Sequence, residues 1–146
     1  MSGRPRAVSP GSGFGEGAAS RLSARRVAAV PQPFAYQGSK RRLAPRILAR
    51  FPGEVERLVE PFCGSAALSL AALAAGRARR VWLNDSFRPL AALWERLLRD
   101  PGAVADGYRR LWVAQGTDPG AHFLAVRRAF NRDGDPTKLL FLLARS

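Results

Sequence analysis

A short loop between two apolar segments carries the residues of this sequence best suited to bind a nucleotide-like ligand. The segment from Leu58 to Leu70 runs from an apolar stretch into a carboxylate, Glu60, and then through a Pro/Gly/Ser turn into an alanine- and leucine-rich segment. Gly64 lets the backbone approach a ligand with no side chain in the way. Ser65 is predicted to cap the helix that follows, and free N–H groups at that helix start would face the ligand.

A second carboxylate follows at a spacing that nucleotide-binding folds use. Asp85 comes after the next apolar run, about 20 residues beyond Gly64. In dinucleotide-binding folds, an acidic residue at this distance accepts hydrogen bonds from ribose hydroxyls. The pattern therefore predicts an α/β fold with a nucleotide-type site. The alternative is an ordinary strand-to-helix turn, with Asp85 capping the next helix.

Composition limits the class of protein. The chain has 146 residues, of which 47% are hydrophobic, enough for one domain with a core. Its formal net charge is +13, from 24 basic and 11 acidic residues, and all but two of the basic residues are arginine. A GC-rich genome explains this surplus as well as selection does, but such a charge favours polyanionic partners, nucleic acid first.

Several classes of site and location are disfavoured. Cys63 is the single cysteine and His122 the single histidine, so the chain offers no internal disulfide and no His/Cys zinc site. No apolar run reaches the roughly 20 residues of a membrane span, and the N-terminus lacks the apolar core of a secretory signal. We therefore expect a cytoplasmic protein without a metal site. Cys63 itself is predicted to be a small, inert, half-buried thiol.

The chain divides into three parts. Residues 1–30 are predicted to be a disordered basic tail, or to follow from a false upstream start codon. Residues 31–100 are predicted to form a cofactor-binding α/β part, and residues 101–146 a helical segment. Two parallel strands alone make no stable sheet, and the chain stops on an apolar helix. We therefore expect this sequence to be the front part of a larger domain.

The expected elements follow from apolar periodicity and from Pro/Gly punctuation. A helix should run from Ser39 to about Phe51, kinked at Pro45 or else beginning near it. A helix capped by Ser86 should follow the second strand. The expected strands are 55–60 and 79–83, and the further expected helices are 65–76, 101–112, 121–130 and 137–143. The three tryptophans are predicted to be core residues: Trp82, Trp94 and Trp112.

Three segments occur in an order that is specific to one enzyme family: Phe34 to Lys40, Val59 to Ser65, and Leu83 to Asp85. In turn they resemble the aromatic-x-Gly-x-Lys motif, the Glu-Pro-Phe-x-Gly cofactor loop and the second-strand acidic motif of the Dam-type N6-adenine DNA methyltransferases. Weaker similarity in residues 93–95 and 138–144 extends the resemblance from about residue 32 to the end of the chain.

The resemblance implies a Rossmann-like fold that binds S-adenosylmethionine and transfers its methyl group to the exocyclic amine of adenine in double-stranded DNA. Tyr36 would lie near the sulfonium, which an aromatic face attracts. Lys40 would pair with the methionine carboxylate, and Asp85 would bind the ribose hydroxyls. The other implied cofactor residues would shape the loop around the methionine moiety: Glu60, Phe62 and Gly64.

Two departures from the family pattern stand out. The loop of the family has a second glycine where this chain has Ala66, which should tighten the site. The catalytic Asp-Pro-Pro-Tyr motif, which holds the target amine of a flipped adenine, is absent. Asp118-Pro119 and Asp135-Pro136 carry only its first half, and both precede predicted helices rather than end strands. No catalytic residue is therefore assigned.

The sequence thus predicts the cofactor-binding portion of a DNA adenine methyltransferase, inactive by itself. The fold would be an incomplete Rossmann-like domain with a helical insertion from about residue 101, the start of a DNA-recognition region. A longer chain or a second polypeptide would complete it. The open alternative is a non-catalytic module, either a degenerate methyltransferase remnant or a basic nucleic-acid-binding protein.

Overall fold

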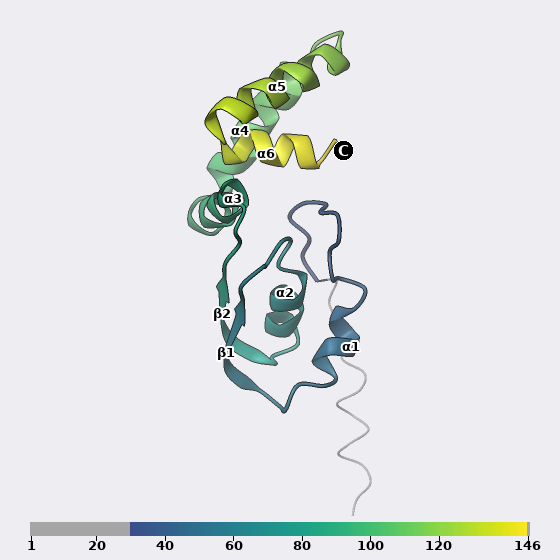
Figure 1. The fold of residues 1–146 in the computed structure, drawn as a ribbon, viewed down its shortest axis with the longest axis vertical. Helices are drawn as coiled ribbons and strands as arrows, with labels where there is room; N and C mark the ends of the chain where they lie inside the picture. The colour runs from purple at the N-terminus through teal and green to yellow at the C-terminus, as the bar shows by residue number, and fades with distance from the viewer. Residues whose placement is uncertain (1–29, 146) are drawn as a thin grey trace, which may run out of the picture.

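The sheet of this protein has two parallel strands in the residues that the structure describes. A computed structural model describes residues 30–145, so the predicted tail lies outside the described residues apart from Val30. Strand β1 (Val55–Glu60) pairs in parallel with β2 (Ala78–Leu83), with Leu58 opposite Val81. This mixture of helices with a parallel sheet confirms the α/β content predicted from the sequence (Figure 1).

Two helices cover one face of the sheet. Helix α2 (Ala67–Ala74) packs on the strands and α1 (Ala44–Leu48) packs on α2 (Figure 1), and their small apolar side chains form a core cluster with Ala78 of β2. Helix α1 begins at Ala44 rather than Ser39, with Pro45 in its first turn. The start near Pro45 is the correct alternative, because proline lacks the N–H that a helix interior needs but a first turn does not.

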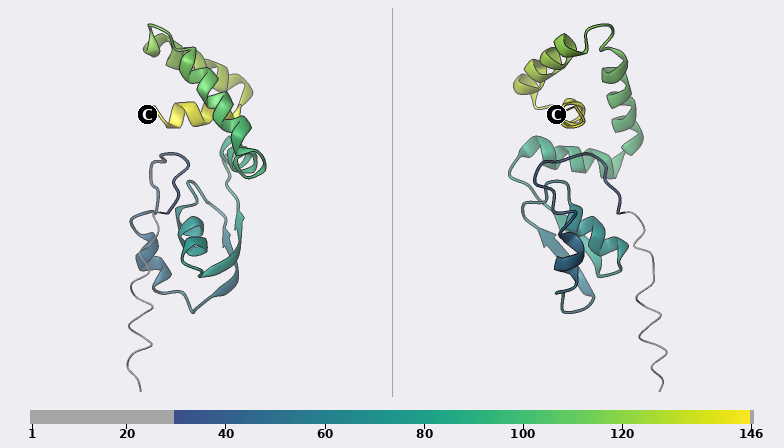
Figure 2. Two further views of the ribbon diagram at one scale, coloured as in Figure 1. Left: turned by 180° about the vertical axis from the view of Figure 1, so that it is seen from behind. Right: turned by 90° about the vertical axis from the view of Figure 1, so that its right-hand side faces the viewer.

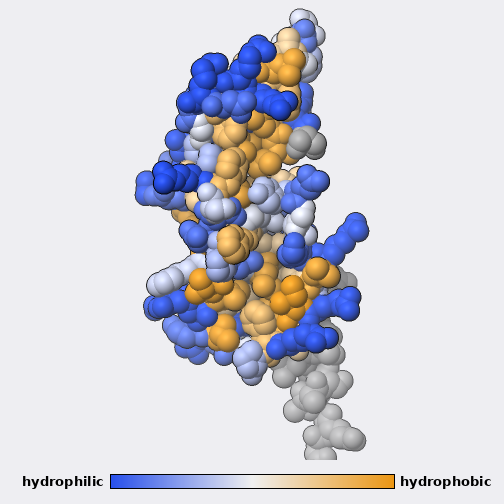
Figure 3. Space-filling view, viewed as in Figure 1, coloured by the Kyte–Doolittle hydropathy of each residue, from blue (hydrophilic) through white to orange (hydrophobic). Residues whose placement is uncertain are grey.

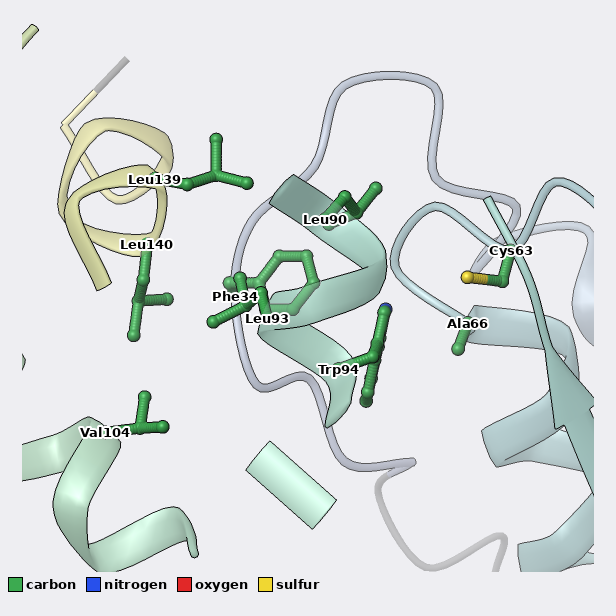
Figure 4. Packing of buried hydrophobic residues seen from close by; sticks show 9 residues of the cluster. All are labelled: Phe34, Cys63, Ala66, Leu90, Leu93, Trp94, Val104, Leu139 and Leu140. Atoms are coloured by element: carbon green, nitrogen blue, oxygen red, sulfur yellow. The ribbon is translucent and has the colours of Figure 1, made fainter. Parts of the chain in front are cut away.

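Helix α3 (Arg88–Arg99) joins the sheet to the rest of the molecule. Its buried face carries Leu90, Leu93 and Trp94, whereas its last turn is basic and exposed. Phe34, from the segment before α1, packs against this face, with its ring centroid 5.4 Å from that of Trp94 (Figure 4). The core therefore fixes the N-terminal segment next to the ends of both strands.

Three further helices follow α3, and each begins with an Asp-Pro pair: α4 (Pro101–Val113), α5 (Pro119–Asp133) and α6 (Pro136–Leu143). The aspartate side chain accepts a backbone N–H of the first turn in every case, and proline occupies the first helical position. The prediction that Asp118-Pro119 and Asp135-Pro136 start helices is confirmed. These helices gather at the end of the molecule away from the sheet (Figure 2).

The prediction that all three tryptophans lie in the core is correct only for Trp94. The side chain of Trp82 is 58% exposed and that of Trp112 is 45% exposed. Trp82 lies on the sheet face that no helix of residues 30–145 covers, where the guanidinium of Arg57 lies 4.2 Å from the ring centroid. Trp112 is likewise partly covered by the guanidinium of Arg145, at 4.7 Å. Cation–π contacts shield these rings in place of a core.

Candidate functional site

The loops that follow the two strands, together with the segment before α1, enclose a cavity of about 330 Å³. The volume is at the lower end of the range of small-molecule sites. All six cofactor residues that the resemblance implied line this one cavity: Tyr36, Lys40, Glu60, Phe62, Gly64 and Asp85. The structure thus brings together residues from three separate segments, although their roles toward a ligand remain predictions.

Asp85 links the end of β2 to the loop after β1. Its Oδ2 accepts the N–H of Gly64 at 3.0 Å, and its Oδ1 accepts the N–H of Phe87 at 3.0 Å. The predicted Ser86 cap is wrong, because α3 begins after Phe87 and it is Asp85 that closes the preceding turn. Each carboxylate oxygen keeps a lone pair free for a ligand, since an ionised carboxylate has about four acceptor positions.

Glu60 stabilises the start of α2. Its Oε2 accepts the backbone N–H of Ser69 in the first turn of that helix, at 3.1 Å, where the helix dipole favours negative charge. Ser65 does not cap α2 as predicted: the residue at the cap is Ala66, and the hydroxyl of Ser65 instead bonds to that of Ser39 at 2.8 Å. Because the N–H of Ser69 donates to Glu60, one of the N–H groups expected to face a ligand already has a partner within the chain.

Gly64 is held from three sides. Its N–H donates to Asp85, and its carbonyl accepts the indole N–H of Trp94 at 2.8 Å. A Cβ at this position would lie 3.1 Å from Cε1 of Tyr36. Burial raises the pKa of Tyr36, and the nearby carboxylate of Asp85 raises it further, so the phenol is neutral at physiological pH. The loop glycine thus lets an uncharged aromatic ring form one wall of the cavity.

Two predicted site residues extend toward solvent. Nζ of Lys40 donates to the carbonyl of Gly38 at 2.8 Å, and the ammonium has two further N–H groups for a ligand carboxylate. The side chain of Phe62 is 80% exposed at the cavity rim. Both side chains are therefore free to move onto a bound molecule, unlike Gly64 and Asp85.

Sequence reasoning missed two features of this site. Trp94 was predicted only as a core residue, yet its indole N–H fixes the carbonyl of Gly64. The hydroxyls of Ser39 and Ser65 tie the segment before α1 to the loop after β1. No pattern of sequence spacing could reveal either contact, because each joins residues that are 26 or 30 positions apart.

Ala66, at the position of the missing glycine, has a left-handed backbone. Its φ is 49°, and no other non-glycine residue between 30 and 145 has a positive φ. The side chain is fully buried, so the Cβ fits, but the conformation costs alanine about 1–2 kcal/mol. Ala66 does not line the cavity, so the structure shows backbone strain at this position, and the tighter site expected from its methyl group stays a prediction.

This strain gives a stability prediction for Ala66→Gly. Loss of the buried methyl and the flexibility of glycine should cost about as much as relief of the strain returns, so the free energy of unfolding should change by less than about 0.5 kcal/mol. Ala72→Gly, equally buried but inside α2, should cost about 2 kcal/mol. Urea unfolding of both variants measures the difference, and equal losses would contradict the strain.

Cys63 gives a second prediction, in its reactivity. The thiol is buried beside the cavity, and burial, together with the carboxylates of Asp85 and Glu60, raises its pKa to about 11. At pH 8 only about one molecule in a thousand then carries a thiolate, the reactive form. We expect iodoacetamide to alkylate the folded chain at least about tenfold more slowly than the urea-unfolded chain. Mass spectrometry of samples taken over time measures both rates. Equal rates at pH 8 would show that the thiol is not protected.

The parallel strands, the glycine loop and the two carboxylates define an α/β protein with a cavity of small-molecule size beside its strand ends. Residues 36–144 match the model of the D12 class N6 adenine-specific DNA methyltransferases. Because this match spans more than half of the chain, the protein belongs to that family, and the resemblance stated from its motifs is confirmed. No curated protein matches the sequence.

Two further observations concern the described part of the chain. None of its helices is both long and apolar enough to cross a lipid bilayer. Within residues 30–145, no group of three or more His, Cys, Asp or Glu side chains is placed to hold a metal ion.

Proposed function

We propose that this chain binds S-adenosylmethionine in the cavity between the strand ends and the segment before α1. It would serve as the cofactor-binding part of an enzyme that methylates adenine N6 in DNA. One observation carries the proposal: the six residues implied by three separate motifs line a single cavity. Membership of the D12 class supports DNA adenine as the acceptor at the level of the family.

The charges around the cavity suit this cofactor. Glu60 and Asp85 supply two carboxylates and Lys40 supplies one ammonium, so the charged side chains that line it sum to −1. S-adenosylmethionine carries a sulfonium, an ammonium and a carboxylate, which sum to +1. The donor and acceptor types also match, because carboxylates accept from hydroxyl and ammonium groups whereas lysine donates to a carboxylate. The residues present therefore fit the cofactor.

Each residue has a role that its contacts allow. Asp85, anchored to two backbone amides, would accept the ribose hydroxyls with its remaining lone pairs. Tyr36 would face the sulfonium, and Lys40 would turn from the carbonyl of Gly38 to the methionine carboxylate. The bound cofactor would supply the electrophilic methyl group. The residues that shape the wall are the remaining three: Glu60, Phe62 and Gly64.

The acceptor side of the site is proposed to lie beside this cavity. A second cavity, of about 860 Å³, shares Tyr36, Gln37 and Gly38 with the first and is also lined by Phe87 and Leu143. It offers room for a flipped base, which must leave the duplex to be methylated. An aromatic side chain on its wall provides a surface on which a base can stack.

The wider architecture is proposed by the same reasoning. The two parallel strands and the helices beside them would be part of a Rossmann-like sheet in residues 31–100, and residues 101–146 would begin the DNA-recognition region. No Asp-Pro-Pro-Tyr motif occurs among the 146 residues. We therefore expect methyl transfer to need residues from outside them, in a longer chain or a second polypeptide, since that motif is what polarises the target amine in the family the chain resembles.

Isothermal titration calorimetry with S-adenosylmethionine tests the proposal. The chain should bind the cofactor at one site, and far-ultraviolet circular dichroism should show that it is folded in the same buffer. A folded chain that releases no heat over several temperatures would reject the cofactor site. That result would favour the non-catalytic nucleic-acid-binding alternative.

A further inference from the structure

The basic residues of this protein fall into two groups that differ in their surroundings. Several exposed basic side chains of the second half have an acidic partner, as in the pairs Arg79–Glu54, Arg99–Glu95 and Arg109–Asp106. The segment 31–53 instead contains five basic residues and no acidic residue. Its positive charge is therefore not neutralised within the segment.

Three of these five side chains recur at a regular interval across α1 and its flanking turns: Arg46 lies in α1, Arg42 lies two residues before its start and Arg50 two residues after its end. Arg42, Arg46 and Arg50 follow one another at intervals of four residues, and all three are exposed. In the described part of the chain none of them makes an ion pair or a side-chain hydrogen bond. Arg41 differs, because it donates to the backbone carbonyls of Pro31 and Val30. We call Arg42, Arg46 and Arg50 the α1 arginine row.

The opposite side of α1 is committed to the fold. Ala44 and Leu48 are buried against the alanines of α2, so packing turns the α1 arginine row toward solvent. Hydrophilic side chains project from the edge of the molecule where α1 lies (Figure 3). The hydrogen bonds from the Ala44 N–H to the Lys40 carbonyl and from the Ala49 N–H to the Pro45 carbonyl continue helical winding into the flanking turns, and residues four apart in such winding share one face.

We propose that the α1 arginine row binds the sugar–phosphate backbone of duplex DNA without regard to sequence. At 1.5 Å per residue the row spans about 12 Å, the axial length of three to four phosphates on one strand. Arg42, the first residue of the row, comes two residues after Lys40, which lines the cavity. It therefore provides a phosphate contact next to the cofactor site. That these phosphates belong to DNA rests on the proposed function.

A lipid surface fits the same charges less well. A helix that lies on a membrane inserts an apolar face between the lipids. The apolar face of α1 is already buried against α2, and α1 has only five residues. Guanidinium groups without an inserting face match a soluble polyanion such as DNA.

The salt dependence of DNA binding tests the proposal. The full chain and the variant Arg42→Gln/Arg46→Gln/Arg50→Gln would be titrated against a fluorescent duplex of about 24 base pairs, from 50 to 200 mM salt. Losing three phosphate contacts should lower the slope of log K against log salt by about 2.7. Over this range the affinity of the wild type should therefore fall about fortyfold more than that of the variant. The charge-preserving variant Arg42→Lys/Arg46→Lys/Arg50→Lys should keep the slope.

The matched control removes the same net charge elsewhere. Arg79, Arg80 and Arg99 are exposed and paired with glutamates, so replacing them with glutamine should leave the slope within about one unit of the wild type. Equal slopes for the two glutamine variants would overturn the proposal. So would binding to anionic phosphatidylserine vesicles that depends on the row while duplex binding does not. Neither outcome alters the calorimetry with S-adenosylmethionine, so the two proposals fail separately.

Discussion

Replacing Asp85 with alanine is expected to weaken binding of S-adenosylmethionine by about 10²-fold or more. Each hydrogen bond to a charged group contributes about 1.5–3 kcal/mol, and the proposed role gives Asp85 two ribose hydroxyls. The substitution also removes the acceptor of the Gly64 N–H, so the loop loses its anchor on the end of β2. Calorimetry with the wild type and the variant measures the loss.

Two further variants separate the loss of the ligand contact from the loss of the fold. Asp85→Asn keeps one carbonyl oxygen for a backbone amide but presents an NH₂ group in place of the second acceptor, so its affinity should lie between those of the wild type and Asp85→Ala. Asp106→Ala removes an exposed carboxylate that pairs with Arg109 outside the cavity, and it should bind as the wild type does. If Asp85→Ala is folded and binds equally well, the site is assigned wrongly.

Spacing along the chain predicts some residues of this site but not others. Spacing predicts Asp85 and Gly64 as site residues because one follows each strand, and parallel strands in register bring their carboxyl ends to the same edge. Lys40 came only from the family resemblance, because no periodicity connects it with the strands. The cavity that these residues share is therefore partly a consequence of strand order and partly a feature that similarity alone could indicate.

What the sequence failed to predict depends on partners from distant segments. Ser65 has the residue type of a helix cap, but the carboxylate of Glu60 reaches the first turn of α2 and the chain turns at Ala66 instead. Propensity gives way here to a contact that exists only once β1 and α2 are packed together. The prediction that Trp82 is a core residue was wrong for a related reason, because an apolar strand residue is buried only if its face of the sheet is covered.

Gly64→Ala is expected to damage both stability and cofactor binding. The φ of Gly64 is +50°, a conformation that costs alanine about 1–2 kcal/mol, and the new Cβ would lie 3.1 Å from Cε1 of Tyr36. The ring, which lines the cavity, must then shift by a few tenths of an ångström. We expect about 2 kcal/mol less free energy of unfolding and about tenfold weaker binding of S-adenosylmethionine.

A matched glycine isolates the contribution of the ring. Gly76 has a φ of +64°, but a Cβ added there would meet no atom within 4 Å, so Gly76→Ala should show the backbone cost alone and leave cofactor binding unchanged. In a Tyr36→Ala background the extra cost of Gly64→Ala should disappear, because the double-mutant cycle removes the contact between the two residues. If Gly64→Ala and Gly76→Ala cost the same and bind the cofactor alike, contact between the loop glycine and Tyr36 does not shape the site. If only the binding of Gly64→Ala falls, the glycine matters because it sets the position of the aromatic wall against the methyl donor.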